Sequence, residues 1–103
     1  MLDDLIQDVK VNINNLFDGD LILFGSYARG DFTSESDINL CVIYNKKLKS
    51  DCDIVDAVGK LINEILLKYD VFISILYKSK FEYNLLSECL PLYMNVKKEG
   101  IKF

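Results

Sequence analysis

The chain alternates between amphipathic helical patterns and short extended apolar runs, and this order constrains its fold more than any other feature. Apolar residues recur at three- and four-residue steps from Leu2 to Leu16, which predicts an amphipathic helix. Residues 18–20 then break the pattern, and Leu21 to Phe24 is a short apolar run typical of a buried strand. Asp37 to Tyr44 alternates between two faces, which predicts a second strand.

The second half of the chain repeats this alternation. Ser50 is a suitable N-cap for a helix whose apolar stripe continues to about Tyr69. The β-branched and aromatic residues of Val71 to Tyr77 predict a third strand. Ser79 and Glu82 have the spacing of a capping box, so another helix should begin there.

The helix that begins at Ser79 should end before Pro91, and a last short helix over residues 92–98 and an apolar tail should follow. The tail, with Ile101 and Phe103, is either core or a docking surface for a partner or a second copy. The element order predicts an α/β (α+β) fold, a small mixed β-sheet flanked by helices. A chain of 103 residues fits a single domain over 1–103.

Composition excludes several classes of function. The chain has no histidine, and its three cysteines lie far apart, so a zinc site or a histidine-based triad is not expected. The net charge is −4 and the lysines are scattered, which disfavours direct binding to nucleic acid. No apolar run reaches the ~20 residues of a membrane span, and the N-terminus does not resemble a signal peptide. We therefore expect a cytoplasmic protein without a membrane association.

The chemistry-bearing residues gather between residues 25 and 39. Gly25 and Ser26 follow a predicted strand and precede a helical turn, an arrangement that offers backbone N–H groups to phosphate. Arg29, the only arginine of the chain, follows within one turn and suits a phosphate contact or a structural clamp. Asp37 and Asn39 share one face of the next strand, where their oxygens could bind a metal ion carrying a triphosphate.

These motifs resemble the signature of the DNA polymerase beta nucleotidyltransferase superfamily, which is Gly-Ser, ten residues, then Asp-x-Asp. The fuller Gly-Ser-Tyr-Ala-Arg-Gly from Gly25 to Gly30, followed by Ser-Asp-Ile, resembles the minimal nucleotidyltransferases, or MNT group. The ending PLYMNVKKEGIKF is similar to the tail of MNT proteins that pair with HEPN-domain toxins.

The resemblance implies the nucleotidyltransferase fold and Mg²⁺-dependent transfer of a nucleoside monophosphate, AMP from ATP in the HEPN pairings, to a hydroxyl of the toxin. Gly25 and Ser26 would then hold the triphosphate, and Asp37 would bind metal. Asp70, at the entrance to the third strand, would correspond to the third carboxylate, which binds metal and helps activate the acceptor hydroxyl. Ser74 in the same strand is the competing alignment.

Asn39 departs from the family pattern, which has aspartate at this position. An amide oxygen can bind Mg²⁺, but it brings no negative charge, so the site should hold metal less tightly. The first hypothesis is an antitoxin enzyme that adenylylates a HEPN toxin. The alternative is an inactive or slow binding module that neutralises its partner by covering it. An antibiotic-modifying enzyme is disfavoured because it needs a second domain, and a polymerase because the chain is acidic. The base preference, acceptor residue and oligomeric state stay open.

Overall fold

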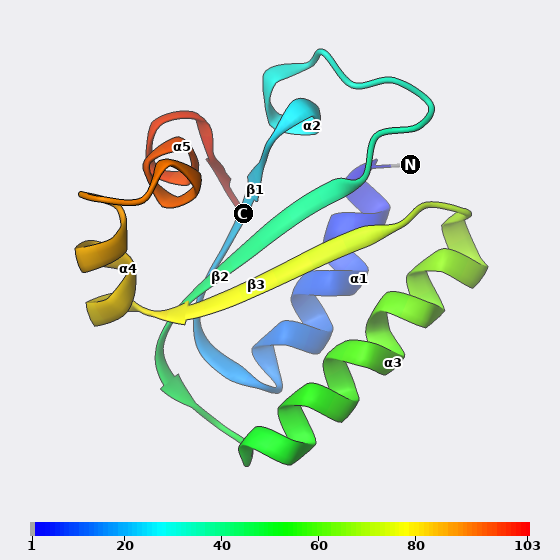
Figure 1. Cartoon of the computed structure of the whole chain (residues 1–103). Helices are drawn as coiled ribbons and strands as arrows, with labels where there is room; N and C mark the ends of the chain where they lie inside the picture. Colours follow the sequence, from blue (N-terminus) through cyan, green and yellow to red (C-terminus); the bar gives the residue numbers. More distant parts are fainter. Residues whose placement is uncertain (1) are drawn as a thin grey trace.

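The computed structural model describes residues 2–103, which form a four-stranded sheet with helices on both faces (Figure 1). The helices are α1 (Leu2–Asn14), α2 (Ser26–Arg29), α3 (Asp51–Tyr69), α4 (Lys80–Leu86) and α5 (Pro91–Glu99). The strands are β1 (Phe17–Phe24), β2 (Ile38–Lys47), β3 (Ile73–Ser79) and β4 (Ile101–Lys102). Helices α1 and α3 cover one face, and α4 and α5 lie against the other (Figure 1).

The sheet is mixed, as the sequence predicts. Its strand order is β3-β2-β1-β4. β1 runs antiparallel to both β2 and β4, whereas β2 and β3 are parallel and are connected through the long helix α3. A parallel pair requires such a crossover connection. β2 therefore lies in the interior of the sheet, with β1 on one side and β3 on the other.

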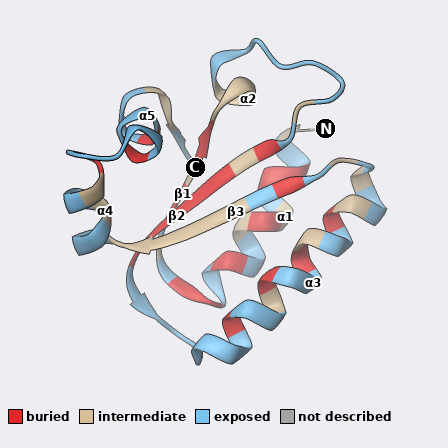
Figure 2. Cartoon of the chain, in the orientation of Figure 1, coloured by how far each residue is buried: buried red, intermediate tan, exposed pale blue. Residues whose placement is uncertain are grey.

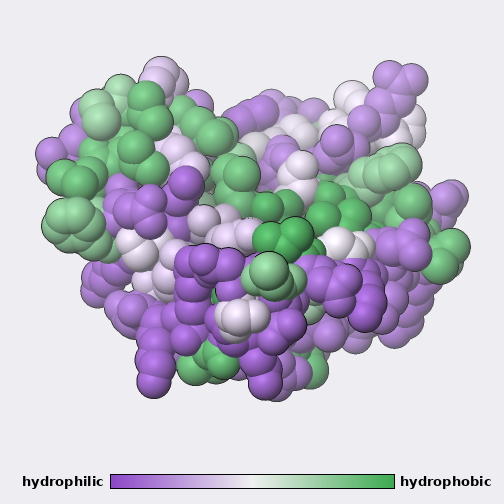
Figure 3. Space-filling model, turned by 60° about the horizontal axis from the view of Figure 1, so that its bottom comes forward, coloured by the Kyte–Doolittle hydropathy of each residue, from purple (hydrophilic) through white to green (hydrophobic). Residues whose placement is uncertain are grey.

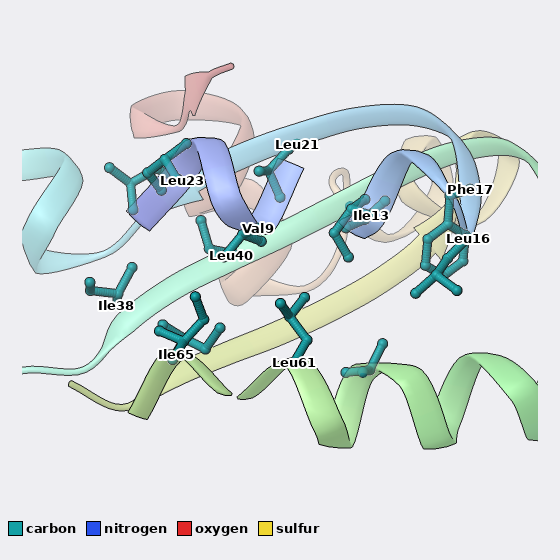
Figure 4. Close-up of a cluster of buried hydrophobic side chains, with 14 of the residues drawn as sticks. Val9, Ile13, Leu16, Phe17, Leu21, Leu23, Ile38, Leu40, Leu61 and Ile65 are labelled. Carbon is teal, nitrogen blue, oxygen red and sulfur yellow. The ribbon is translucent and has the colours of Figure 1, made fainter. Parts of the chain in front are cut away.

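The main core fills the space between α1, α3 and the sheet. Val9 and Ile13 of α1 meet Leu61 and Ile65 of α3 over Leu40 of β2, and all five are buried (Figures 2 and 4). Each such side chain stabilises the fold by about 1.5–3 kcal/mol relative to an exposed position. Both helices carry an apolar stripe because these residues face the main core.

A smaller core lies on the opposite face, under α4 and α5. Phe24, Cys41 and Ile43 of the sheet pack against Val96 of α5, with Tyr83 of α4 at the margin. The two faces of β2 are therefore both buried along most of the strand. Asn39 is the one polar side chain of the strand before Asn45, and the last three residues, Asn45 to Lys47, are polar and exposed.

Strand β1 begins at Phe17, four residues before the expected start at Leu21. The segment Asp18–Asp20 is part of the strand, although it was expected to separate the helix from the strand. It contains a register shift against β2, between Asp18 and Gly19. A Cβ atom on Gly19 would stand 2.2 Å from the carbonyl oxygen of Ile43. Gly19 therefore permits a close backbone approach within the sheet, which the turn-like composition concealed.

The C-terminal tail, expected to be either core or a docking surface, belongs to the sheet. Lys102 pairs with Ile22, Ile101 with Leu23, and the N–H of Phe103 donates to the carbonyl of Leu21 at 2.8 Å. The side chain of Phe103 packs against the main core. The tail is thus strand β4 at the edge of the fold.

The predicted helix starts are confirmed by their caps. The hydroxyl of Ser50 accepts a hydrogen bond from the N–H of Asp53 at 3.2 Å, and that of Ser79 from the N–H of Glu82 at 3.1 Å. Each cap satisfies one of the backbone donors that a helix start leaves without a partner. Among the helices of residues 2–103, none has the length and hydrophobicity of a membrane span.

Candidate functional site

The turn between β1 and α2 has a backbone that only glycine adopts readily. Gly25 has φ 81° and ψ −155°, and Gly30 closes the helical turn in the left-handed region with φ 84°. The N–H groups of Ala28 and Arg29 both donate to the carbonyl of Gly25 at 3.1 Å. The turn is therefore closed on itself, with Ser26 as its first helical residue.

Asn39 lies directly beside this turn. It pairs with Phe24, the last residue of β1, in the antiparallel register of β1 and β2. Its amide nitrogen is 2.7 Å from the point where a Cβ on Gly25 would stand. The Gly-Ser turn and the Asp-Ile-Asn segment, separated by ten residues in the motif, thus meet at one end of the sheet.

Asp37 immediately precedes β2 and is exposed. Its neighbour Ile38 donates its N–H to the carbonyl of Phe72 at 3.0 Å, which fixes the start of β2 against the segment entering β3. Asp37 and Asn39 are two residues apart, the spacing that places side chains on one face of an extended chain. The structure therefore brings Gly25, Ser26, Asp37 and Asn39 to the same end of the sheet.

Asp70 takes a different position from the strand entrance expected for it. It is the C-cap of α3, with φ 57° and ψ 39°, and its N–H donates to the carbonyl of Leu66 at 2.9 Å. Strand β3 begins only at Ile73, and the residue that pairs with Asn39 is Ser74. The strand position beside Asn39 therefore carries a hydroxyl.

Arg29 contacts two carboxylates. Its Nε donates to Asp31 at 3.2 Å and its Nη1 to Glu99, at the end of α5, at 2.9 Å. The hydrogen bonds to Asp31 and then Glu99 raise the pKa of the guanidinium. Of the two roles expected of Arg29, these ion pairs are those of a structural clamp, and the phosphate contact stays a prediction. The partner Glu99 was not predicted, since 70 residues separate the two and no local pattern connects them.

The segment after the turn is held by an aromatic contact. The ring of Phe32 stacks on that of Tyr27, with centroids 4.2 Å apart and an interplanar angle of 5°. Tyr27 in turn packs against the main core. This contact fixes the start of the polar loop that leads to Asp37.

Cys41 lies two residues beyond Asn39 in β2 and is fully buried. Burial raises the pKa of its thiol to about 11, with a smaller opposing effect of Lys78. Because the thiolate is the reactive form of cysteine, this thiol is inert at neutral pH. It serves as a small packing group, as the cysteine spacing suggests.

The donor set suits a magnesium ion that arrives with a triphosphate. Mg²⁺ prefers hard oxygen ligands and commonly uses one or two carboxylates together with phosphate oxygens. Asp37 supplies a carboxylate, Asn39 an amide oxygen and Ser74 a hydroxyl. Across residues 2–103, no three acidic, cysteine or histidine side chains cluster as a metal site. These residues therefore suit a metal ion that is also bound by the phosphates of the nucleotide.

Comparisons with known proteins agree with this fold. The family described as "Nucleotidyltransferase domain" matches residues 2–102. Two curated proteins of Methanocaldococcus jannaschii are similar, both named as "Putative protein adenylyltransferase". MJ0141 is 34% identical over 82% of this chain and 88% of its own length. MJ0604 is 44% identical over 62% of this chain, and the matched part spans 57% of MJ0604.

Solved structures show the same fold. The crystal structure described as a toxin–antitoxin with AMP-PNP has a TM-score of 0.63 at 23% identity, covering 97% of this chain and 69% of the other. A mutant of the toxin–antitoxin pair MntA–HpeT has a TM-score of 0.62 at 23% identity, covering 100% and 71%.

Fold, motif and family together define the class as nucleotidyltransferase. The chain belongs to the nucleotidyltransferase domain family.

Proposed function

We propose that the protein transfers AMP from ATP, with Mg²⁺, to a hydroxyl group of a protein partner, and that the partner is a HEPN-domain toxin that this modification silences. The convergence of the Gly25–Ser26 turn with Asp37 and Asn39 at one end of the sheet is the observation that carries the proposal. It unites a phosphate-binding turn with oxygen ligands for a metal. Such an antitoxin acts in the cytoplasm.

In the proposed reaction the acceptor oxygen attacks the α-phosphorus of ATP. The bond from this phosphorus to the bridging oxygen breaks, and pyrophosphate leaves as the phosphodiester forms. Gly25 and Ser26 would bind the triphosphate, with Arg29 beside them, and Asp37 and Asn39 would hold Mg²⁺, which neutralises phosphate charge. This assignment gives the turn a role in positioning and the strand a role in charge neutralisation.

The acceptor hydroxyl must lose its proton during transfer, and two residues compete for the position that helps this step. Asp70 is the carboxylate expected from the family pattern, and it ends α3. Ser74 pairs with Asn39 and has no basic side chain. Comparing Asp70→Asn with Ser74→Ala decides between them, because only loss of the residue that assists proton removal should abolish transfer while Mg²⁺-ATP still binds.

A protein partner also suits the surface of α4 and α5. Exposed apolar side chains gather there, namely Phe81, Leu85, Leu90, Leu92 and Met94. Figure 3 shows apolar surface at the upper left, on the side of the molecule where α4 lies. Contiguous apolar patches of this kind commonly mark interaction sites. The same patch could join two copies of the chain.

A second function is favoured by the pairing of Asn39 with Ser74. Two neighbouring positions on adjacent strands lack a negative charge, which weakens any site for two metal ions. In this function the protein neutralises its toxin by covering it, with or without bound nucleotide.

The experiment that tests both functions uses ATP labelled at the α-phosphate and a HEPN-domain toxin as the proposed partner. The enzyme function predicts labelled toxin that requires Mg²⁺ and disappears with Asp37→Asn. The covering function predicts no label and a toxin that Asp37→Asn neutralises as well as the wild type. Calorimetry with ATP in Mg²⁺ and in EDTA completes the test, because equal affinity in both would contradict a metal-held triphosphate.

A further inference from the structure

The C-terminal segment contacts the chain both before and after Gly25, the first residue of the Gly25–Arg29 turn. β4 pairs with the end of β1 through Leu23 and Ile101, two residues before Gly25. Four residues after Gly25, Arg29 donates to Glu99. Between these contacts the chain passes through Gly100, where α5 ends.

The approach at Gly100 is close. A Cβ atom there would stand 2.5 Å from Cγ2 of Ile22 and 2.3 Å from the carbonyl of Val96. The end of α5 therefore lies directly on β1, and the pairing of Ile101 with Leu23 follows at once. This geometry fixes where the carboxylate of Glu99 stands relative to the turn.

Glu99 is the more buried partner of the ion pair. Its side chain is 26% exposed, against 46% for Arg29 and 63% for Asp31. Asp31 lies only two residues from Arg29, so that pair is local to the turn. The pair with Glu99 is the one that connects the turn to the C-terminal helix.

We propose that Glu99 is a positioning residue of the nucleotide site, which holds Arg29 and thereby fixes the Gly25–Arg29 turn against the end of α5. This inference rests on the proposed function, because it assumes that the turn binds a triphosphate. Arg29 then acts mainly by ordering the turn. A fixed turn favours phosphate binding, because N–H donors that already point toward the phosphate need not be reoriented when it binds.

Glu99→Gln tests the inference, since it keeps the size of the side chain and removes its charge. Mg²⁺-ATP affinity should fall about three- to fivefold, the effect expected of a partly exposed ion pair. Hydrogen exchange at the N–H groups of Ala28, Arg29, Gly30 and Asp31, which close the turn, should accelerate by a similar factor in the nucleotide-free protein.

Asp20→Asn is the matched control. It removes the pair of Asp20 with Lys102, at 3.4 Å, which also joins β1 to the C-terminal segment but does not reach the turn. Its Mg²⁺-ATP affinity should equal that of the wild type. A double-mutant cycle with Arg29→Gln adds a readout that general destabilisation would not change. Once Arg29 is gone, Glu99→Gln should have no further effect on affinity.

The outcomes separate the two proposals. A wild-type protein without affinity for Mg²⁺-ATP overturns the proposed function and the positioning role with it. A wild-type protein that binds Mg²⁺-ATP, beside a Glu99→Gln variant of equal affinity and equal exchange, overturns the positioning role alone. Additive effects of Arg29→Gln and Glu99→Gln would likewise show that the two residues act independently.

Discussion

The amide nitrogen of Asn39 lies 2.7 Å from the place that a Cβ atom on Gly25 would occupy. This close approach joins the Gly25–Ser26 turn to strand β2, and it makes residue 25 intolerant of a side chain. Gly25→Ala should lower the free energy of unfolding by about 1–3 kcal/mol, because φ 81° with ψ −155° is essentially restricted to glycine. Mg²⁺-ATP binding should fall too. Denaturant unfolding and calorimetry measure the two effects.

Gly59→Ala is the control for this substitution. Gly59 lies within α3, and a Cβ there would meet nothing within 4 Å. Alanine should raise the stability by about 0.5–1 kcal/mol through its helix propensity and leave nucleotide binding unchanged. A Gly25→Ala protein that behaved like Gly59→Ala would contradict the geometry of the turn.

Asn39→Asp tests whether the site is weakened by a missing charge. The new carboxylate would stand near Asp37, so repulsion should slightly destabilise the protein without metal. Mg²⁺-ATP should reverse this loss, since a ligand that binds the folded state stabilises it. Labelling of a partner should rise, and Asp37→Asn in the same background should abolish it. If neither thermal shift nor labelling changes, the site lacks more than one charge, and the covering function is the better account.

Ser26→Ala should leave the fold intact, because no hydrogen bond to the Ser26 hydroxyl stabilises the turn among the residues that the structure describes. Its hydroxyl should instead donate to phosphate, and loss of such a donor costs ~10²-fold in comparable sites. Single-turnover transfer assays with a melting curve as control separate these effects. Unchanged transfer would mean that the triphosphate binds elsewhere.

Asp8 connects α1 to α3 by accepting hydrogen bonds from Lys68, at 2.8 Å, and from the hydroxyl of Tyr69. The hydrogen bond from Lys68, followed by that from Tyr69, lowers the pKa of the Asp8 carboxyl. A lowered folded pKa means that this stabilisation is present above the unfolded pKa, about 4, and is lost as the pH falls through the folded value. Asp8→Asn should therefore lower the Tm at pH 7, and the difference from wild type should disappear at strongly acidic pH. A difference independent of pH would contradict this account.

Removal of residues 101–103 should destabilise the domain by about 2 kcal/mol, because it removes β4 and the packing of Phe103 on the main core. Chemical unfolding of the shortened protein measures this loss. A shortened protein that kept full stability but lost its partner would instead restore the docking role first considered for the tail. Ile101→Thr, at an exposed position of β4, is a milder variant that retains the strand.

Local patterns were sufficient to predict most of the fold. The apolar stripe of α3 and the caps at Ser50 and Ser79 depend on neighbouring residues, so they were visible in the sequence. The start of β1 at Phe17 was not, because Gly19 has the composition of a turn and is explained only by its contact with Ile43. β4 has two residues, too few for any periodicity, and exists because β1 offers it an edge.

The same division applies to the candidate site. The Gly25–Ser26 turn and the Asp37–Asn39 spacing lie within one motif, and their proximity could be predicted from it. The sequence offers both Asp70 and Ser74 for the position beside Asn39, and it does not decide between them, because the register of a parallel pair depends on how α3 returns the chain to the sheet. The length of α3 and its end at Asp70 place Ser74 of β3 beside Asn39 of β2.

The ion pair between Arg29 and Glu99 joins residues 70 positions apart, and this separation has a consequence for synthesis. A ribosome adds roughly 5–20 residues per second, so β1 and the glycine turn emerge several seconds before α5 and β4 exist. During that interval the hairpin of β1 and β2 can form, but the turn lacks its final contacts. We expect a nascent chain to gain its affinity for nucleotide in one late step, when the last helix folds back onto the first strand. Competence for nucleotide binding would then appear only after the last helix has been synthesised.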